Sequence, residues 1–264
     1  MKKITIFGGD SRIQTVYYGL IDAGFTVDSF GLFEDESCDM ESSDIFLLPV
    51  PTTRDSITVY APLTGKNILL DNIAAKAENK LVLTGNHMLN TQKCIDYCKS
   101  DAYSLKNAVP TAEGAIALAV SNTPFTLWKS RALVIGYGRV GKIMAERLKG
   151  MHASVTVSAR KSSDIALIQT LGFKSILTSQ VPQKIQDFDI IFNTIDVPIL
   201  ESEMEKLYGK TVIDLSSKGC FNHDKAKQAG VNAIKAPGLP GKTAPQTAGR
   251  ILTETVLELI QQNT

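Results

Sequence analysis

The sequence has few of the residues that would mark a metal site, a disulfide framework or a membrane span. Its 264 residues include four cysteines, three histidines and one tryptophan. Four cysteines in a chain of this length do not make a disulfide framework, and no nearby histidine or further cysteine completes a metal set around Cys94 and Cys98. No apolar run approaches the roughly 20 residues that a spanning helix needs. We therefore expect a globular protein with no bound metal and no membrane span.

An excess of charge of one sign is also missing. The 28 basic and 27 acidic residues leave a formal charge of +1, so no uniform field indicates nucleic acid or an anionic membrane as a partner. Apolar residues make up 44% and charged residues 21% of the chain, as in ordinary folded proteins. The first apolar run ends at once in Gly-Gly-Asp-Ser-Arg, which is too short for a secretion signal. We expect a cytoplasmic protein.

Short apolar runs alternate with helical stretches in the first hundred residues. We expect strands at residues 3–7, 26–30, 44–48, 67–70 and 80–84. Helices are expected at residues 11–23, directly after residue 70, and at about 90–99. Such alternation predicts an α/β fold with a doubly wound parallel sheet, whose strand-to-helix loops share one edge.

A helix rich in small residues is predicted over 111–122, with Pro110 fitting its first turn. The alternation then restarts, with strands at 131–135, 154–158, 189–193, 211–215 and 232–235 and helices at 139–149, 163–171 and 223–229. A loop at 237–241 leads to a C-terminal helix over about 245–261, whose apolar stripe we expect to pack on the N-terminal part. The pattern thus predicts a second doubly wound parallel sheet.

The strongest motif is Gly136-Tyr137-Gly138-Arg139-Val140-Gly141, which lies between an expected strand and an expected helix. The first glycine allows a tight turn, the second lets a pyrophosphate approach the backbone, and the third lets helix and strand pack closely. The amide groups at the helix N-terminus then face the phosphates. The motif predicts a Rossmann domain that binds a dinucleotide.

The end of the next strand indicates which dinucleotide binds. An NAD site carries an acidic residue there, about 20 residues beyond the glycines. This chain has Ser158, Arg160 and Lys161 instead. These groups suit a ribose 2′-phosphate, because arginine can bind a phosphate through two hydrogen bonds. NADP is therefore favoured over NAD, the alternative being that Arg160 and Lys161 are solvated loop charges.

Other polar residues follow expected strands and are candidates for binding a substrate. Asp10, Ser11 and Arg12 open the first helix, where a carboxylate could bind, although Asp10 or Ser11 could equally just cap that helix. Thr52 and Thr53 could add hydroxyl donors on the same edge.

A further group of candidates lies in the later half of the chain. Asn193, Thr194 and Ile195 are expected beside the nicotinamide half of the cofactor, and Pro237 and Gly238 follow another strand on that edge. In the segment Ser217-Lys218, Lys218 is the best-placed cation for a substrate carboxylate, unless it is a surface lysine.

Two domains with a cleft between them follow from these patterns. Residues 1–108, joined by the C-terminal helix 245–264, are predicted to form a flavodoxin-like α/β domain that binds substrate. Residues 109–244, which begin with the connecting helix 111–122, are predicted to form the Rossmann domain that binds NADP.

Several segments together resemble the A subunit of dipicolinate synthase from spore-forming bacteria. They are Asn107–Ile116, Gly136–Gly141, Ala159–Lys161, Asn193–Ile195, Asp214–Lys218 and Ala236–Gly241, with Ala244-Pro245 and Thr247–Gly249. The resemblance implies an NADP-dependent oxidation of dihydrodipicolinate to dipicolinate, which is pyridine-2,6-dicarboxylate. It also implies a partner, the flavoprotein-like B subunit of the same synthase, and activity in the mother cell during sporulation. The sequence does not define the oligomeric state and is compatible with a homo-oligomer.

This reaction requires two anion sites for the substrate and one proton acceptor. Asp10-Ser11-Arg12 with Thr52 and Thr53 would supply one anion site, and Ser217 with Lys218 the other. Glu113 and Asp10 are the candidate catalytic proton acceptors, although Glu113 also suits the first turn of its helix. Two alternatives stay open: another NAD(P)-dependent dehydrogenase of 2-hydroxy or 2-amino acids, and a non-catalytic NADP-binding subunit.

Overall fold

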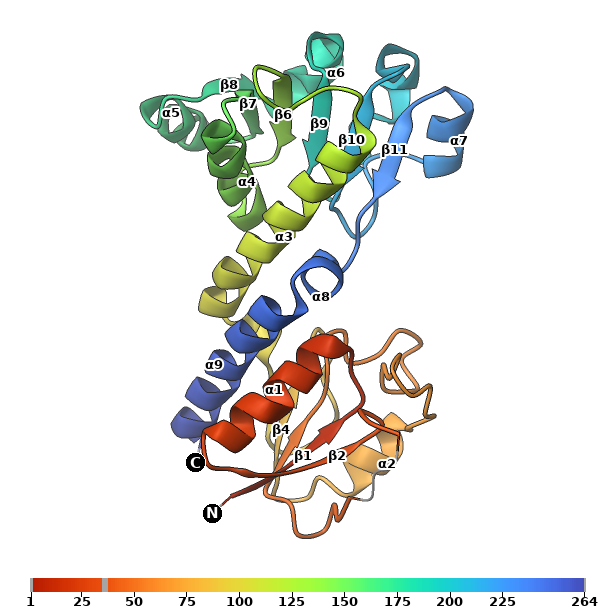
Figure 1. Ribbon diagram of the computed structural model, residues 1–264, viewed down its shortest axis with the longest axis vertical. Coiled ribbons are helices and arrows are strands. Elements are labelled where there is room, and N and C mark those ends of the chain that lie inside the picture. The colour runs from red at the N-terminus through yellow and green to blue at the C-terminus, as the bar shows by residue number, and fades with distance from the viewer. Residues whose placement is uncertain (1, 35–37, 264) are drawn as a thin grey trace. The chain divides into compact units, whose positions relative to one another are not determined.

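The computed structural model describes residues 2–34 and 38–263 (Figure 1). The chain divides into two compact units, and each is described here by itself. The first unit runs through Asn107 and resumes at Thr243, and the second comprises Ala108–Lys242. The helix α3 (Asp101–Asn122) contributes residues to both.

The first unit contains a parallel sheet of five strands. These are β1 (Lys3–Phe7), β2 (Thr26–Phe30), β3 (Ile45–Leu47), β4 (Leu81–Thr84) and β5 (Cys94–Asp96). The order across the sheet is β2-β1-β3-β4-β5, and every pairing is parallel. This is the strand order of the flavodoxin-like fold. The residues that the sequence predicts to bind substrate follow β1 and β3, at one edge of this sheet.

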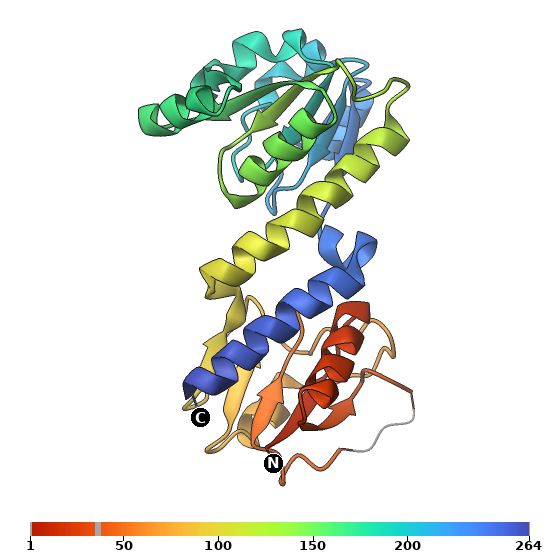
Figure 2. The same cartoon turned by 60° about the vertical axis from the view of Figure 1, so that its left-hand side comes forward.

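Two helices of the first unit pack against each other at close range. In Figures 1 and 2, α1 (Ser11–Asp22) and α9 (Pro245–Asn263) lie side by side. A Cβ on Gly249 would lie 2.5 Å from the Cβ of Thr15, so only glycine fits there. Leu252 and Val256 of α9 join the same apolar cluster as Ile13 of α1. The last helix of the chain is therefore part of the first unit, as is the short α2 (Leu70–Ala75).

The second unit contains a parallel sheet of six strands. These are β6 (Arg131–Ile135), β7 (Ser154–Ala159), β8 (Lys174–Leu177), β9 (Ile190–Asn193), β10 (Thr211–Asp214) and β11 (Asn232–Lys235). Their order is β11-β10-β9-β6-β7-β8, with parallel pairings throughout. Counted within the unit, this is the Rossmann order, and the direction of winding reverses between β6 and β9.

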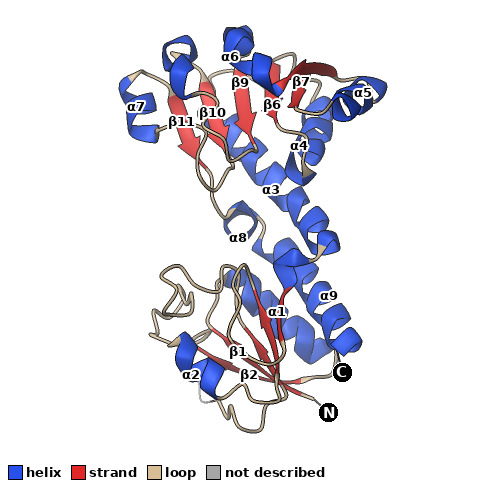
Figure 3. Cartoon of the chain, turned by 180° about the vertical axis from the view of Figure 1, so that it is seen from behind, coloured by secondary structure: helices blue, strands red, loops and turns tan. Residues whose placement is uncertain are grey.

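Helices cover the sheet of the second unit on both faces (Figure 3). In β6, Ala132 and Val134 belong to one apolar cluster, whereas Leu133 and Ile135 belong to another. Successive side chains of a strand point to opposite faces, so both faces are buried, as in a doubly wound sheet. The helices are α4 (Arg139–Gly150), α5 (Ser162–Thr170), α6 (Val181–Lys184) and α7 (His223–Gln228), together with the later part of α3, whose Ala115 and Ala119 join one of these clusters. The short α8 (Leu239–Thr243) spans the boundary between the two units. Short 3-10 helices occupy Thr178–Gln180, Ile185–Asp187 and Glu201–Leu207.

The expected α/β class with two parallel sheets is confirmed, but the helix predicted at residues 90–99 is wrong. Cys94–Asp96 form the edge strand β5, which pairs with Val82–Thr84, and a 3-10 helix over Tyr97–Lys99 follows. The Asp96 side chain accepts a hydrogen bond from the amide of Cys98, which begins that turn. Pairing with a neighbouring strand, which local spacing does not reveal, decides the structure here.

Other elements also differ from the sequence-based expectation. Residues 67–70 form no strand, because Leu69 makes a single antiparallel bridge with Thr58 before α2 begins. The helix α3 begins at Asp101, so Pro110 lies inside it and not in its first turn. The strand β8 was not expected, and α8 replaces part of the loop predicted at 237–241. Within the described ranges, no helix combines the length and the apolar character that crossing a membrane requires.

Candidate functional site

A cavity of about 600 Å³ lies in the second unit, where β6, β7 and β9 end. This is the point where the winding of the sheet reverses, the usual binding crevice of open α/β sheets. The lining residues are Gly136, Tyr137, Gly138, Ala159, Arg160, Lys161, Asp164, Thr178, Thr194, Ile195, Asp196 and Val197.

The turn between β6 and α4 requires glycine at two positions. Gly136 has a φ of +102°, and a Cβ there would lie 2.6 Å from Thr194 and Ile195 atoms. A Cβ on Gly141 would lie 2.2 Å from the carbonyl oxygen of Gly136. The first glycine therefore permits the turn, and the last permits the close approach of helix and turn.

Gly138 is the residue on which a ligand would approach the backbone. It is the N-cap of α4, makes no side-chain cap, and a Cβ built on it would meet no atom within 4 Å. The first turn of α4 contains no acidic residue. Open space, uncapped amide groups and the positive end of the helix dipole together fit the phosphates of a dinucleotide.

Charged side chains line the same cavity at the end of β7. Arg160 and Lys161 are both exposed and both line it. Asp164, in the first turn of α5, lines it as well, although the motif pattern did not point to it. The cavity wall at the end of β7 therefore offers two cations and one carboxylate.

Ser158 supports the glycine turn and does not line the cavity. Its side chain is fully buried, and its Oγ accepts hydrogen bonds from the amide of Gly136 at 3.3 Å and from Thr178 Oγ1 at 3.4 Å. The spacing in the sequence located the end of the strand but not the direction of this side chain. Arg139, Val140 and Gly141 belong to α4 and lie outside the lining set.

The segment after β9 contributes two cavity residues and one buried amide. Thr194 and Ile195 line the cavity, and Thr194 Oγ1 donates to the carbonyl of Ile135 at 2.8 Å. Asn193 is fully buried, and its Nδ2 donates to Ile195 O and to Asp214 Oδ1, both at 2.9 Å. Asn193 therefore holds the loop that lines the cavity through buried hydrogen bonds, and its own side chain does not line the cavity.

Asp196 connects the cavity to Ser217 and Lys218, a link that the sequence patterns missed. Its Oδ1 accepts hydrogen bonds from Ser217 N at 2.7 Å, Ser217 Oγ at 3.0 Å and Lys218 N at 3.1 Å. The amide of Lys218 contributes most to holding the pKa of Asp196 below its ordinary value. The expected substrate segment is therefore tied to a residue that lines the cavity, while the Lys218 side chain is exposed.

The other expected residues of the second unit lie elsewhere. Glu113 is exposed on α3, where its carboxylate pairs with Arg147 Nε at 3.1 Å. Pro237 and Gly238 are exposed in the turn before α8 and are not among the residues lining the cavity. The structure does not bring these residues together with the glycine turn.

In the first unit, the Asp10 side chain acts as a helix cap. Its carboxylate accepts a hydrogen bond from the amide of Arg12 at 3.1 Å and pairs with Arg12 Nη2 at 2.7 Å. Arg12 is only 7% exposed and also donates to the carbonyl of Val50. Ser11 is the first residue of α1. Arg12 is thus already bound within the protein.

The two expected threonines also bind within their own loop. Thr52 is fully buried, with its Oγ1 donating to Pro49 O at 3.0 Å and accepting from Gly85 N at 2.8 Å. Thr53 Oγ1 donates to Asp55 Oδ1 at 2.9 Å. Both hydroxyl groups stabilise the loop after β3.

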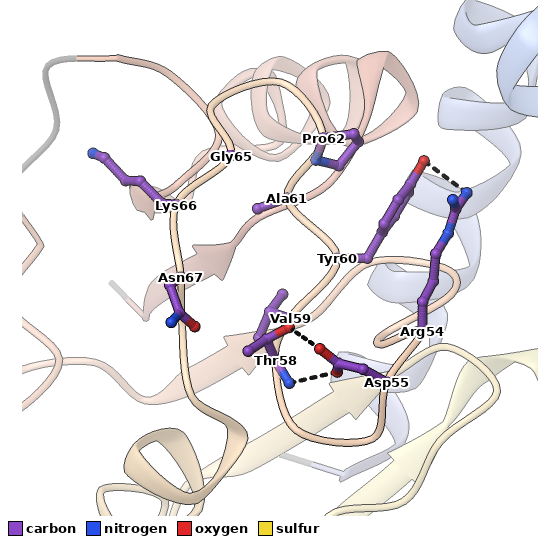
Figure 4. A pocket seen from close by; sticks show the side chains of 10 residues that line it. All are labelled: Arg54, Asp55, Thr58, Val59, Tyr60, Ala61, Pro62, Gly65, Lys66 and Asn67. Carbon is purple, nitrogen blue, oxygen red and sulfur yellow. Dashed lines mark hydrogen bonds between the residues drawn. The ribbon is translucent and has the colours of Figure 1, made fainter.

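A second, shallower cavity of about 380 Å³ follows this loop (Figure 4). Arg54 is exposed, and its guanidinium group lies 4.1 Å from the centre of the Tyr60 ring and donates to the Tyr60 hydroxyl at 3.0 Å. The carbonyl of Tyr60 accepts the amide of Gly9 at 2.8 Å, so the cavity borders the turn after β1. Arg54 is an exposed cation on this edge that the sequence patterns did not single out.

Together, the strand order, the glycine turn and the cavity at the reversal point define a Rossmann-type unit that shares its chain with a second parallel α/β unit. Dehydrogenases have this fold. The structure of D-lactate dehydrogenase from Escherichia coli matches with a TM-score of 0.64 at 13% identity, over 99% of this chain and 96% of that chain.

A stronger similarity is to the A subunit of dipicolinate synthase. An alignment of 287 positions with that protein of Bacillus subtilis (strain 168) shows 29% identity and covers 98% of this chain and 96% of the relative. The crystal structure of the same subunit from Bacillus halodurans matches with a TM-score of 0.90 at 28% identity, over 98% of this chain and 97% of that chain. No protein-family model matches the chain. The resemblance expected from the sequence motifs is confirmed.

Proposed function

We propose that the protein is the dehydrogenase subunit of a dipicolinate synthase, which oxidises dihydrodipicolinate to dipicolinate with NADP⁺. The observation that carries the proposal is its similarity to the A subunit of dipicolinate synthase over nearly the whole chain. The glycine turn and its cavity support a nicotinamide dinucleotide as the cofactor. The dehydrogenase fold supports an oxidoreductase reaction.

The residues around the cavity fit such a cofactor. The amide groups at the start of α4, with Gly138 in open space, would hold the pyrophosphate. Arg160 and Lys161 would bind a 2′-phosphate, while Thr194 and Ile195 would flank the nicotinamide half. When bound, the oxidised nicotinamide supplies a hydride acceptor.

For this oxidation, the protein must bind the substrate and the cofactor and provide one proton acceptor. Dihydrodipicolinate loses a hydride and a proton, and the product ring is aromatic, so the reaction is strongly downhill. The protein must hold the ring in position, exclude water and accept the proton. We assign one substrate carboxylate to Ser217 and Lys218, whose loop Asp196 anchors to the cavity.

The first unit, taken by itself, also carries candidate carboxylate-binding groups. Within the first unit, Arg54 is a better candidate for binding a carboxylate than Arg12, because Arg12 is buried and paired with Asp10 whereas Arg54 is exposed. Asp10 and Glu113 stay the two candidate proton acceptors, and each is paired with an arginine: Asp10 with Arg12 at 2.7 Å and Glu113 with Arg147 at 3.1 Å. The partner protein would be the flavoprotein-like B subunit of the synthase.

The test is a direct assay of the reaction. Freshly prepared dihydrodipicolinate and NADP⁺ are mixed with the protein without oxygen, and dipicolinate and NADPH are followed by their absorbance. The assay is repeated with NAD⁺ and with the B subunit added. We expect equal amounts of dipicolinate and NADPH, formed faster than without protein. Absence of NADP⁺-dependent product, with and without the B subunit, would refute the proposal.

A further inference from the structure

Asp214, at the end of β10, is a fully buried carboxylate that accepts five hydrogen bonds. Its Oδ1 accepts from Asn193 Nδ2 at 2.9 Å, Ser216 N at 3.1 Å and Ser216 Oγ at 2.6 Å. Its Oδ2 accepts from Cys220 N at 3.0 Å and His223 Nε2 at 3.3 Å. Both oxygens are therefore saturated with donors.

Four of these five hydrogen bonds come from two segments that form the candidate site, and the fifth comes from His223 at the start of α7. Asn193 directly precedes Thr194, Ile195 and Asp196, which line the cofactor cavity. Ser216 and Cys220 bracket the segment that carries Ser217 and Lys218. A single carboxylate thus holds both the cavity loop after β9 and the substrate loop after β10.

We propose that Asp214 is the positioning residue of this site, and that its negative charge fixes the Ser216–Cys220 loop relative to the cofactor cavity. The inference deepens the proposed function and rests on it for the identity of the substrate. Asp214 itself is fully buried, so it would act on the site only through the residues that it binds.

The charge, and not merely the shape, of this side chain matters. Burying a carboxylate is unfavourable unless donors surround it. Burial raises the pKa of Asp214, but hydrogen bonds from Ser216, Asn193 and Cys220 lower it by more, so the group is ionised near neutral pH. An asparagine of the same shape would have to direct an NH₂ group toward at least one of these backbone or side-chain donors. The loop would then lose part of its anchor.

The first experiment compares Asp214→Asn with Asp189→Asn. Asp189 is a matched control, because it also accepts hydrogen bonds in the second unit, from Arg131, but lies at the start of β9 and away from both loops. Hydrogen exchange is measured by mass spectrometry on the whole protein, together with the affinity for NADP⁺ and the kinetics of dihydrodipicolinate oxidation.

For Asp214→Asn we expect exchange at residues 216–220 to accelerate about tenfold and the KM for dihydrodipicolinate to rise about tenfold, with a Kd for NADP⁺ changed less than about threefold. Asp189→Asn should leave these loop amides and the KM unchanged. Equal acceleration across the whole unit in both variants, or unchanged loop exchange and KM in Asp214→Asn, would overturn the inference. If the wild-type protein shows no turnover, the proposed function fails, whereas loop exchange still tests the anchor.

Two further variants separate charge from packing. The exchanged pair Asn193→Asp with Asp214→Asn restores a hydrogen bond between these positions but moves the charge away from the Ser216 and Cys220 amides, so we expect no rescue. Full rescue would show that the charge at position 214 is not what holds the loop. Should Asp214→Asn fail to fold, Ser216→Ala removes one donor to Asp214 and the acceptor of Gly219 N. It should loosen the same segment, and unchanged exchange there would also count against the inference.

Discussion

The carboxylate of Asp196 accepts the amide hydrogen of Ser217 at 2.7 Å, although 21 positions separate the two residues. This contact joins the loop that lines the cofactor cavity to the loop expected to bind substrate. Both loops follow neighbouring parallel strands, β9 and β10, whose carboxyl ends meet at one edge of the sheet. Binding of cofactor and of substrate should therefore be physically linked within the second unit.

This link predicts that Asp196→Ala raises the KM for dihydrodipicolinate more than the Kd for NADP⁺. Removing the acceptor leaves two amides and a hydroxyl without their partner, and we expect an increase in KM of about fivefold to tenfold. Asp196→Asn keeps a carbonyl oxygen and should show a smaller increase in KM.

Asp164→Ala is the control. Asp164 also lines the cavity, but the amides of Ser217 and Lys218 donate to Asp196 and not to Asp164. An equal rise in KM for Asp164→Ala would argue against the anchor.

The preference for NADP is tested by Arg160→Asp. If Arg160 pairs with a 2′-phosphate, the Kd for NADP⁺ should rise by about tenfold or more, while the Kd for NAD⁺ changes by less than about threefold. Both constants can be measured by titration calorimetry. Lys227→Asp makes the same change of charge on the exposed surface of α7 and should affect neither cofactor. Equal weakening of both cofactors by Arg160→Asp would contradict the assignment.

Gly136 should not tolerate a side chain. In Gly136→Ala the new Cβ would lie 2.6 Å from Thr194 and Ile195 atoms, at a φ of +102°. We expect a loss of about 1–3 kcal/mol in the free energy of unfolding and a marked loss of dinucleotide affinity. Gly150→Ala, at the end of α4, meets no atom within 4 Å and should change neither quantity appreciably. Urea denaturation and cofactor titration provide the two measurements.

The contact between α1 and α9 predicts a second glycine effect, far in sequence from the first. Gly249→Ala would place a Cβ 2.5 Å from Thr15 Cβ and 2.6 Å from Arg12 O, so the helices must separate. We expect a loss of about 1–3 kcal/mol in the free energy of unfolding. Arg250→Ala, at the exposed neighbouring position, is the control. Unchanged thermal stability in Gly249→Ala would show that the two helices adjust without cost.

Local patterns predicted the elements around the glycine motif well. The sequence placed β6, α4 and β7 within a residue or two, because an apolar strand, a glycine turn and an amphipathic helix each leave a local signature. The same reasoning failed at Cys94–Asp96, because an edge strand of three residues is fixed by its pairing with β4. Short strands at sheet edges carry little information in their own sequence.

The sequence predicted the glycine turn of the candidate site, but it did not predict which carboxylates hold the surrounding loops. Asp164, Asp196 and Asp214 each act through contacts with residues brought near by the fold, so no motif identified their roles. For Ser158, the sequence located the residue correctly but did not predict the direction of its side chain. Its spacing from Gly136 located the strand end correctly, yet the strand turns its hydroxyl inward to Gly136 and Thr178.

The position of α9 has a consequence for how the protein is made. The first unit begins with β1 but includes a helix that follows the entire second unit in the sequence. As the chain leaves the ribosome, residues 2–107 emerge without the partner that covers α1, whereas the second unit is synthesised without interruption. Nascent chains should therefore acquire a protected Rossmann unit before the N-terminal sheet becomes resistant to protease.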